Sequence, residues 1–111
     1  MDNVLIIARD EVVAALLGLL VELRGHIPRF PAKGESPVSA LASDQFSIVV
    51  VDCDHPDCSE LLAEIRNATA QPVLFSPLRV SGDLREVAAR HGARSFTLPT
   101  DPETFAKTLQ L

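Results

Sequence analysis

Four branched apolar residues in succession, Ile48, Val49, Val50 and Val51, place the strongest constraint on the fold. Successive side chains of a strand point to opposite faces of a sheet, so both faces of a strand with this sequence must be covered. Continuous apolar runs of this kind are typical of parallel sheets that carry helices on both sides. Residues 47–51 therefore predict a central strand of an α/β domain.

Shorter apolar runs alternate with segments of helical spacing along the rest of the chain. The runs predict strands at residues 3–7, 27–31, 72–75 and 95–97, and the spacing predicts helices at residues 11–24, 36–43, 59–68, 82–91 and near the C-terminal end. Pro28 and Pro31 cannot donate to a sheet ladder, so we expect the second strand at an edge. This alternation predicts one doubly wound domain over residues 1–111, with a five-stranded parallel sheet in the order 2-1-3-4-5.

Composition excludes several classes of function. A net charge of -5 argues against a general nucleic-acid or anionic-membrane surface, and we expect no direct contact with either. The longest apolar stretch, residues 12–21, is too short to span a bilayer. Cys53 and Cys58 are too few to staple a secreted scaffold, so a reducing compartment, the cytoplasm, is expected.

Chemistry in an open parallel sheet is expected beyond the carboxyl ends of the strands. Cys53, His55 and Cys58 lie in this region, but no second pair of cysteine or histidine ligands follows them, and we expect no metal site there. No glycine-rich phosphate loop and no nucleophile elbow is present, so neither a cofactor nor an enzymatic activity is predicted. The residues just beyond the predicted strands, where a site is expected, are Ala8, Arg9, Asp10, Asp52, Cys53, Asp54, Ser76, Leu98 and Pro99.

Several strand ends resemble those of the receiver domains of bacterial response regulators. Residues 48–56 are similar to the receiver pattern of an apolar strand, a phosphoryl-accepting aspartate at Asp52 and a proline four residues later. Residues 72–76 resemble the fourth receiver strand, which ends at Ser76, and residues 92–102 resemble the fifth strand with its Gly-Ala turn. The resemblance covers nearly the whole chain and implies a flavodoxin-like receiver topology.

Two departures from the receiver pattern concern charge. Receivers hold a divalent ion with an acidic pair after the first strand, where this chain has Ala8 and Arg9, and they carry a lysine where this chain has Leu98. Asp10 is one residue late for the pair, and is expected to cap the following helix or else to supply one metal ligand. Arg9 either provides a fixed cation beside Asp52 or is an exposed loop residue.

The resemblance and its departures together favour a non-enzymatic signalling and protein-interaction module, a pseudo-receiver that does not work through aspartyl phosphorylation. The alternative is an active phospho-accepting receiver that uses Asp52, with Asp10 or Asp54 for metal and Ser76 for switching. A more distant third hypothesis is a small nucleotide-binding or enzymatic domain. The resemblance implies a protein partner or output domain, or a homodimer, on a face formed by residues 82–111.

Overall fold

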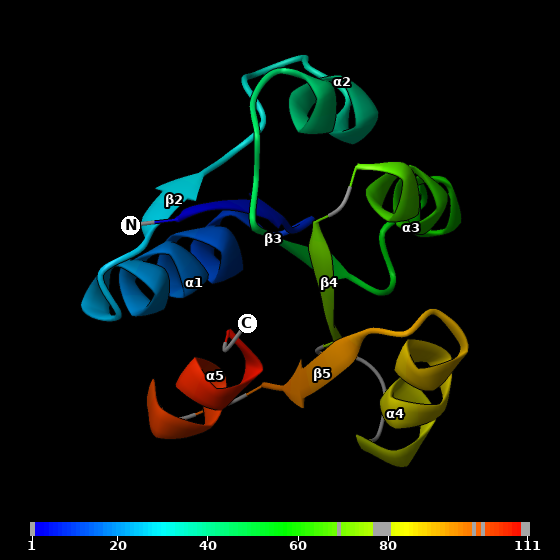
Figure 1. Ribbon diagram of the computed structural model, residues 1–111. Helices are drawn as coiled ribbons and strands as arrows, with labels where there is room; N and C mark the ends of the chain where they lie inside the picture. Colours follow the sequence, from blue (N-terminus) through cyan, green and yellow to red (C-terminus); the bar gives the residue numbers. More distant parts are fainter. Residues whose placement is uncertain (1, 69, 77–80, 99, 101, 110–111) are drawn as a thin grey trace.

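A computed structural model describes residues 2–68, 70–76, 81–98, 100 and 102–109. Across these residues the strands are β1 (Asn3–Ile7), β2 (Ile27–Arg29), β3 (Ile48–Asp52), β4 (Gln71–Ser76) and β5 (Arg94–Thr97). They form a parallel sheet in the order β2-β1-β3-β4-β5, shown in Figure 1, and this confirms the predicted class and order. Strand β2 lies at the edge beside β1 and is shorter than predicted, since it ends before Pro31.

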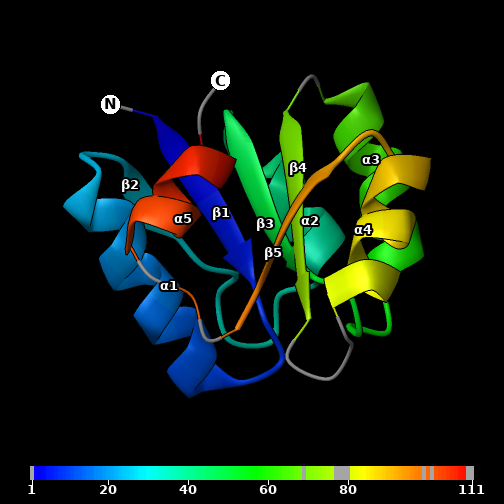
Figure 2. The same ribbon diagram turned by 90° about the horizontal axis from the view of Figure 1, so that it is seen from below.

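Helices cover both faces of the sheet (Figure 2). The helices in the described residues are α1 (Glu11–Leu23), α2 (Pro37–Ala42), α3 (Cys58–Asn67), α4 (Ser81–Arg90) and α5 (Pro102–Thr108). Helices α1 and α5 contribute to one buried apolar cluster, and α2, α3 and α4 contribute to the other. Helices α1 to α4 begin and end within one residue of their predicted bounds, and α5 lies near the C-terminal end, where a helix was predicted without bounds. Pro99 and Asp101, which belong to the predicted fifth-strand motif, lie outside the described residues.

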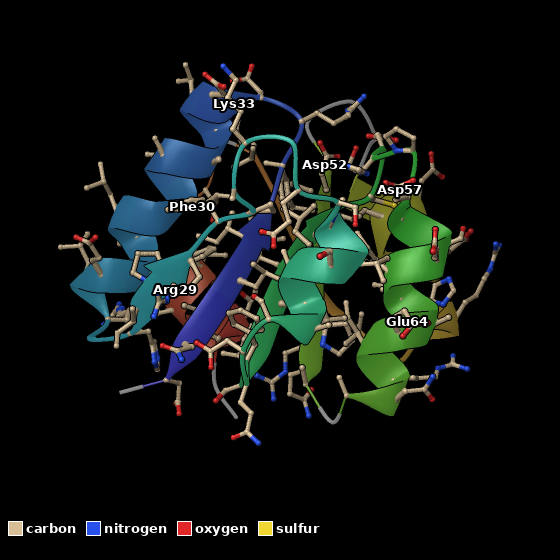
Figure 3. All side chains as sticks on the ribbon, turned by 90° about the horizontal axis from the view of Figure 1, so that it is seen from above. Arg29, Phe30, Lys33, Asp52, Asp57 and Glu64 are labelled. Atoms are coloured by element: carbon tan, nitrogen blue, oxygen red, sulfur yellow. The ribbon has the colours of Figure 1, made fainter. Side chains whose placement is uncertain are left out.

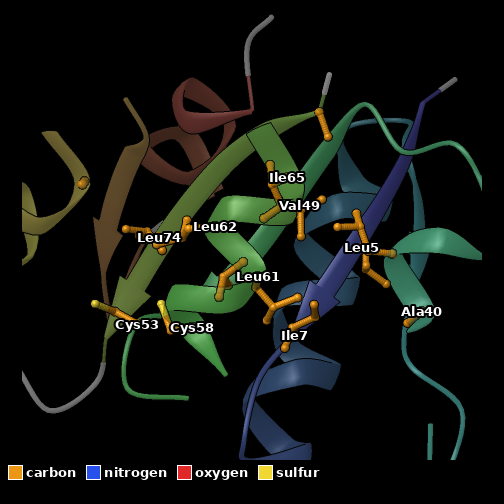
Figure 4. Packing of buried hydrophobic residues seen from close by; sticks show 14 of the residues in the cluster. Leu5, Ile7, Ala40, Val49, Cys53, Cys58, Leu61, Leu62, Ile65 and Leu74 are labelled. Carbon is orange, nitrogen blue, oxygen red and sulfur yellow. The ribbon is translucent and has the colours of Figure 1, made fainter. Parts of the chain in front are cut away.

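Strand β3 is buried on both faces, as its sequence predicts. Residues 48–51 are all 0% exposed. Val49 and Val51 belong to the cluster beneath α2, α3 and α4, part of which is drawn in Figure 4. Ile48 and Val50 belong to the cluster beneath α1 and α5. The side chains of this one strand therefore alternate between two separate cores, which explains why all four residues before Asp52 are apolar.

Aromatic rings attach α5 to the sheet. Phe75 on β4 stacks on Phe96 of β5 with ring centroids 5.4 Å apart. Phe96 in turn meets Phe105 of α5 edge-on at 5.0 Å. Such pairs add to the free energy gained from burial alone. The C-terminal helix is therefore held in a fixed place on the side of the sheet that also carries α1.

Helix α1 is apolar along most of its length but is too short to span a membrane. Helix α1 has 13 residues, and a bilayer needs about 20. Among the residues that the structure describes, no helix is long and apolar enough to cross a membrane.

Candidate functional site

Asp52 is the last residue of β3, at the carboxyl edge of the sheet (Figure 3). Asp52 is 3% exposed, so its carboxylate is almost completely shielded from solvent. One oxygen, Oδ2, accepts a hydrogen bond from Arg9 Nε at 2.9 Å and a longer one from the Arg9 backbone N–H at 3.4 Å. The other oxygen, Oδ1, accepts from the backbone N–H of Asp54 at 3.0 Å. Both oxygens of the predicted acceptor are therefore engaged within the protein.

Arg9 supplies the positive charge at this site. Its guanidinium forms the ion pair with Asp52 and lies 3.9 Å from Asp54 Oδ2, measured from Nη2. The hydrogen bond to Asp52 raises the pKa of the Arg9 guanidinium above its usual value; desolvation works in the opposite direction, and the charges of Asp52 and Asp54 add to the rise. The sequence left two interpretations of Arg9 open, a cation beside Asp52 or an exposed loop residue. In the structure its guanidinium lies beside Asp52. One guanidinium therefore lies against two carboxylates.

Ser76 joins the same cluster from the end of β4. The residue is 1% exposed, and its hydroxyl donates a hydrogen bond to Asp54 Oδ2. Strand β4 lies beside β3 with Asp52 in register with Phe75, so Ser76 is carried to the same edge of the sheet. The structure thus brings four of the predicted site residues together: Arg9, Asp52, Asp54 and Ser76.

Asp10 has a different role from these four. Its Oδ1 accepts hydrogen bonds from the backbone N–H groups of Val12 at 2.8 Å and Val13 at 3.3 Å. These are orphan donors in the first turn of α1, and satisfying them is what an N-cap residue does. Asp10 is therefore the N-cap of α1, which is one of the two roles that the sequence predicted for it.

Leu98, which the sequence resemblance matched to the receiver lysine, follows β5 and is half-buried. It packs against the apolar cluster beneath α1 and α5. Ala8, at the first position of the expected acidic pair, packs against the same cluster. These two side chains therefore pack against the core, and neither contributes charge to the site.

A divalent ion does not fit the side chains at this site. The carboxylates that would bind it, Asp52 and Asp54, already face the Arg9 guanidinium, which would repel a cation. Within the described part of the chain, no group of three or more histidine, cysteine or acidic side chains is placed to hold a metal ion. The Nδ1 atom of His55 accepts a hydrogen bond from the Asp57 backbone N–H at 3.0 Å, so this nitrogen is engaged within its own loop.

Two features of this edge were not anticipated from sequence. The first is the hydrogen bond between Ser76 and Asp54, residues 22 positions apart. The second is a pocket of about 490 Å³ beside the cluster, between the first half of α1 and the loop that follows β2. Phe30, Glu35 and His55 line it together with Ala8 and Glu11. Loop residues carry no periodic pattern, so nothing in the sequence marks this pocket.

Comparisons with known proteins place the fold. No protein family model matches the sequence, and no curated protein matches it. A response regulator receiver protein from Burkholderia phymatum is similar in structure, with a TM-score of 0.80 and 19% identity over 98% of this chain and 92% of that chain. The chemotaxis protein CheY4 of Vibrio cholerae has a TM-score of 0.79 and 19% identity, covering 99% of this chain and 97% of its own.

A third similar structure is a response regulator protein from Burkholderia pseudomallei that contains a phosphorylated aspartic acid, a calcium ion and citrate. Its TM-score is 0.79, with 21% identity over 99% of this chain and 67% of that chain. At these identities the likeness concerns the fold. The chain therefore has the CheY-like, flavodoxin-like fold of response regulator receiver domains.

Proposed function

We propose that this chain, over residues 1–111, is a non-enzymatic signalling and protein-interaction module that works without aspartyl phosphorylation. The observation that carries the proposal is the ion pair between Arg9 and Asp52 at the end of the central strand, with Nε and Oδ2 2.9 Å apart. The resemblance implies a divalent ion near the acceptor aspartate of receivers, and the ion pair supports a different source of positive charge here, the Arg9 guanidinium.

The accessibility of the acceptor oxygens argues against phosphoryl transfer. An attacking carboxylate oxygen must approach phosphorus in line with the leaving oxygen. Oδ2 of Asp52 is occupied by two donors from Arg9, and Oδ1 is occupied by the Asp54 amide. With the residue 3% exposed, a phosphodonor reaches neither oxygen unless the ion pair first opens.

The charge balance argues in the same direction. The side chains of Arg9, Asp52 and Asp54 together carry a net negative charge, and the incoming phosphoryl group is also an anion. Catalysis of such a transfer depends on positive groups placed where charge develops. Leu98 contributes none, and the single guanidinium is already shared between two carboxylates.

The competing proposal is an active receiver that accepts a phosphoryl group on Asp52. The observation in its favour is that Ser76 and Arg9 lie within one cluster with Asp52 and Asp54, so that a hydroxyl and a cation are near the acceptor position. On this view Arg9 would leave Asp52 and bind the phosphoryl oxygens instead.

Labelling with a small phosphodonor separates the two. The protein is incubated with magnesium and acetyl phosphate, beside an ordinary receiver as positive control, and intact mass is recorded. We expect no adduct on the wild-type chain while the control is modified. A stoichiometric adduct that disappears in Asp52→Ala would overturn the proposal and establish the active receiver.

A gain-of-function variant gives a second test. Arg9→Asp removes the guanidinium and adds a carboxylate beside Asp52 and Asp54, which creates the kind of oxygen-rich site that magnesium prefers. We expect magnesium to shift backbone amide resonances at the ends of β1 and β3 in this variant and not in the wild type. Equal responses would show that Arg9 does not govern cation binding.

The partner also belongs to the proposal. Similar folds occur in receiver domains that regulate other proteins, and the resemblance points to residues 82–111 as the face for a protein partner or output domain in two-component signalling. We propose a cytoplasmic setting, no contact with nucleic acid and no cofactor. Deletion of residues 82–111 is unsuitable as a test of this face, because Phe105 belongs to the core. Charge reversal at the exposed residues Arg85 and Arg90 tests the face instead, and we expect it to weaken binding of the partner.

A further inference from the structure

The outward face of α1 carries four exposed apolar side chains. Val12 is 77% exposed, Leu16 48%, Leu19 60% and Leu23 69%. The opposite side of the same helix buries Leu17, Leu20 and Val21 against the sheet. A surface helix ordinarily presents polar side chains to water, whereas a helix that is apolar on all sides is ordinarily buried. We call Val12, Leu16, Leu19 and Leu23 the α1 stripe.

Two further apolar residues extend this surface on one side. Ile27 at the start of β2 is 38% exposed, and Phe30, just beyond β2, is 46% exposed. The Phe30 ring lies over α1, because a Cβ added to Gly18 would come within 2.8 Å of Phe30 Cζ. Figure 3 shows α1 at the edge of the molecule, with Phe30 beside it and side chains directed away from the sheet.

The apolar patch formed by these residues is large for a chain of this size. The exposed fractions of these six side chains correspond to roughly 600 Å² of apolar surface, at the upper end of the range for the largest patch on a monomer. Two such patches facing each other would bury roughly 1,200 Å² in total, which is the lower limit for a specific interface. The area therefore suits a weak pair rather than a permanent one.

The spacing of the α1 stripe points to a second copy of this chain as the occupant. The intervals between successive stripe residues are four, three and four, the pattern of a coiled-coil seam. This series is the same in both directions along the helix. An antiparallel second copy therefore sets Val12 opposite Leu23 and Leu16 opposite Leu19 in every layer, as a two-fold axis requires. An unrelated partner helix would need no such symmetry.

Antiparallel packing also suits the helix ends and the sequence beside the seam. It places the partial positive charge at the start of each α1 alongside the partial negative charge at the end of the other, which is the favourable arrangement of two helix dipoles. The small side chain of Ala15, which is exposed beside the stripe, leaves room for close approach of the two helices.

We infer that this protein forms a weak two-fold homodimer in which the α1 stripes of two copies pack against each other in antiparallel orientation. The interface is made by α1 side chains that take no part in the ion pair of Arg9 with Asp52, and it lies on the opposite side of the sheet from α4. It leaves the α4 side of the molecule open to a partner.

Sedimentation velocity over a wide concentration range tests the inference. We expect the wild-type mass to rise from 12.0 kDa toward twice that value with concentration. Leu19→Glu places a charge in the centre of the seam and should raise the dissociation constant at least tenfold. Because Leu19 is exposed, the circular dichroism spectrum of this variant should match that of the wild type. Ala89→Glu, the same charge change on the exposed side of α4, should leave dimerisation unchanged.

Disulfide trapping tests the orientation. In the antiparallel pair, residue 12 of one copy adjoins residue 23 of the other, whereas the two copies of residue 12 are about 16 Å apart at 1.5 Å per residue. A mixture of Val12→Cys and Leu23→Cys proteins should therefore cross-link, and Val12→Cys alone should not, since bridged Cα atoms lie within about 7 Å. A wild type that stays monomeric at every concentration, or a dimer that Ala89→Glu but not Leu19→Glu dissociates, overturns the inference. Cross-linking of Val12→Cys alone overturns the antiparallel arrangement.

Discussion

Replacement of Asp52 by asparagine tests whether the carboxylate at the end of β3 is a structural partner of Arg9. The substitution keeps the shape of the side chain and removes its charge. In the wild type both oxygens accept hydrogen bonds from N–H donors, Arg9 on one side and the Asp54 amide on the other. Asparagine has one acceptor oxygen and one donor NH₂ group. Whichever way the amide is turned, its NH₂ group must face a donor.

The magnitude follows from burial at position 52. Arg9 is partly exposed and can turn toward water, so the asparagine oxygen should stay on the Asp54 amide and the NH₂ group should face the space that Arg9 occupied. A buried polar group left without a partner costs about 1–3 kcal/mol. Relief of the repulsion between Asp52 and Asp54 offsets part of this cost. We therefore expect Asp52→Asn to lower the free energy of unfolding by about 1–2 kcal/mol, a fall in Tm of about 5–10 °C for a chain of this length.

Urea denaturation followed by circular dichroism measures the change. Protein concentration must be the same for all variants, because dimerisation would add to apparent stability. Glu64→Gln, which neutralises an exposed carboxylate on α3, is the matched control and should change the stability by less than about 0.5 kcal/mol. In an open acceptor site, removal of one of two neighbouring carboxylates would leave stability unchanged or raise it. Either of those results would refute the ion pair as the state of the site in solution.

Three further substitutions test the cores. Val50→Asp should abolish cooperative unfolding, because position 50 is 0% exposed and an unpaired charge there costs several kcal/mol; an unchanged thermal melt would contradict the burial of β3. Phe105→Ala should cost about 3–5 kcal/mol in urea denaturation, since the ring is fully buried against Phe96, and a loss below about 1 kcal/mol would mean that α5 is loosely attached. Gly18→Ala should raise the stability by up to about 1 kcal/mol, because helix propensity improves and the exposed Phe30 ring can move aside; a decrease would show that this ring is fixed on α1.

The order of the sheet was accessible from sequence, and so was the edge at which the residues after β3 and β4 meet. A run of branched apolar residues needs cover on both faces, and the positions of Pro28 and Pro31 exclude a central place for the second strand. Because parallel strands end at a common edge, the sequence predicts Asp52 and Ser76, which end the third and fourth strands, at the same edge of the sheet. These predictions depend on hydrogen-bonding capacity and on periodicity, which are properties of the chain itself.

The direction of the Arg9 side chain was not determined by sequence. An arginine after a strand can extend into water or turn inward, and the choice depends on a carboxylate 43 positions away that the fold brings within hydrogen-bonding distance. The pairing of Ser76 with Asp54 has the same origin. Contacts between residues on different strands come from the tertiary arrangement, and no local pattern encodes them.

The two apolar sides of α1 also separate what the sequence predicts from what the tertiary structure decides. The sequence of residues 11–24 predicts a helix rich in apolar residues, and the helix is present as α1. Which side is buried depends on where β1 and α5 lie, since a helix with apolar residues all round could present either side to the sheet. Tertiary packing selected Leu17, Leu20 and Val21 for the core. It left Leu16 and Leu19 facing water, because one sheet can cover only one side of a helix.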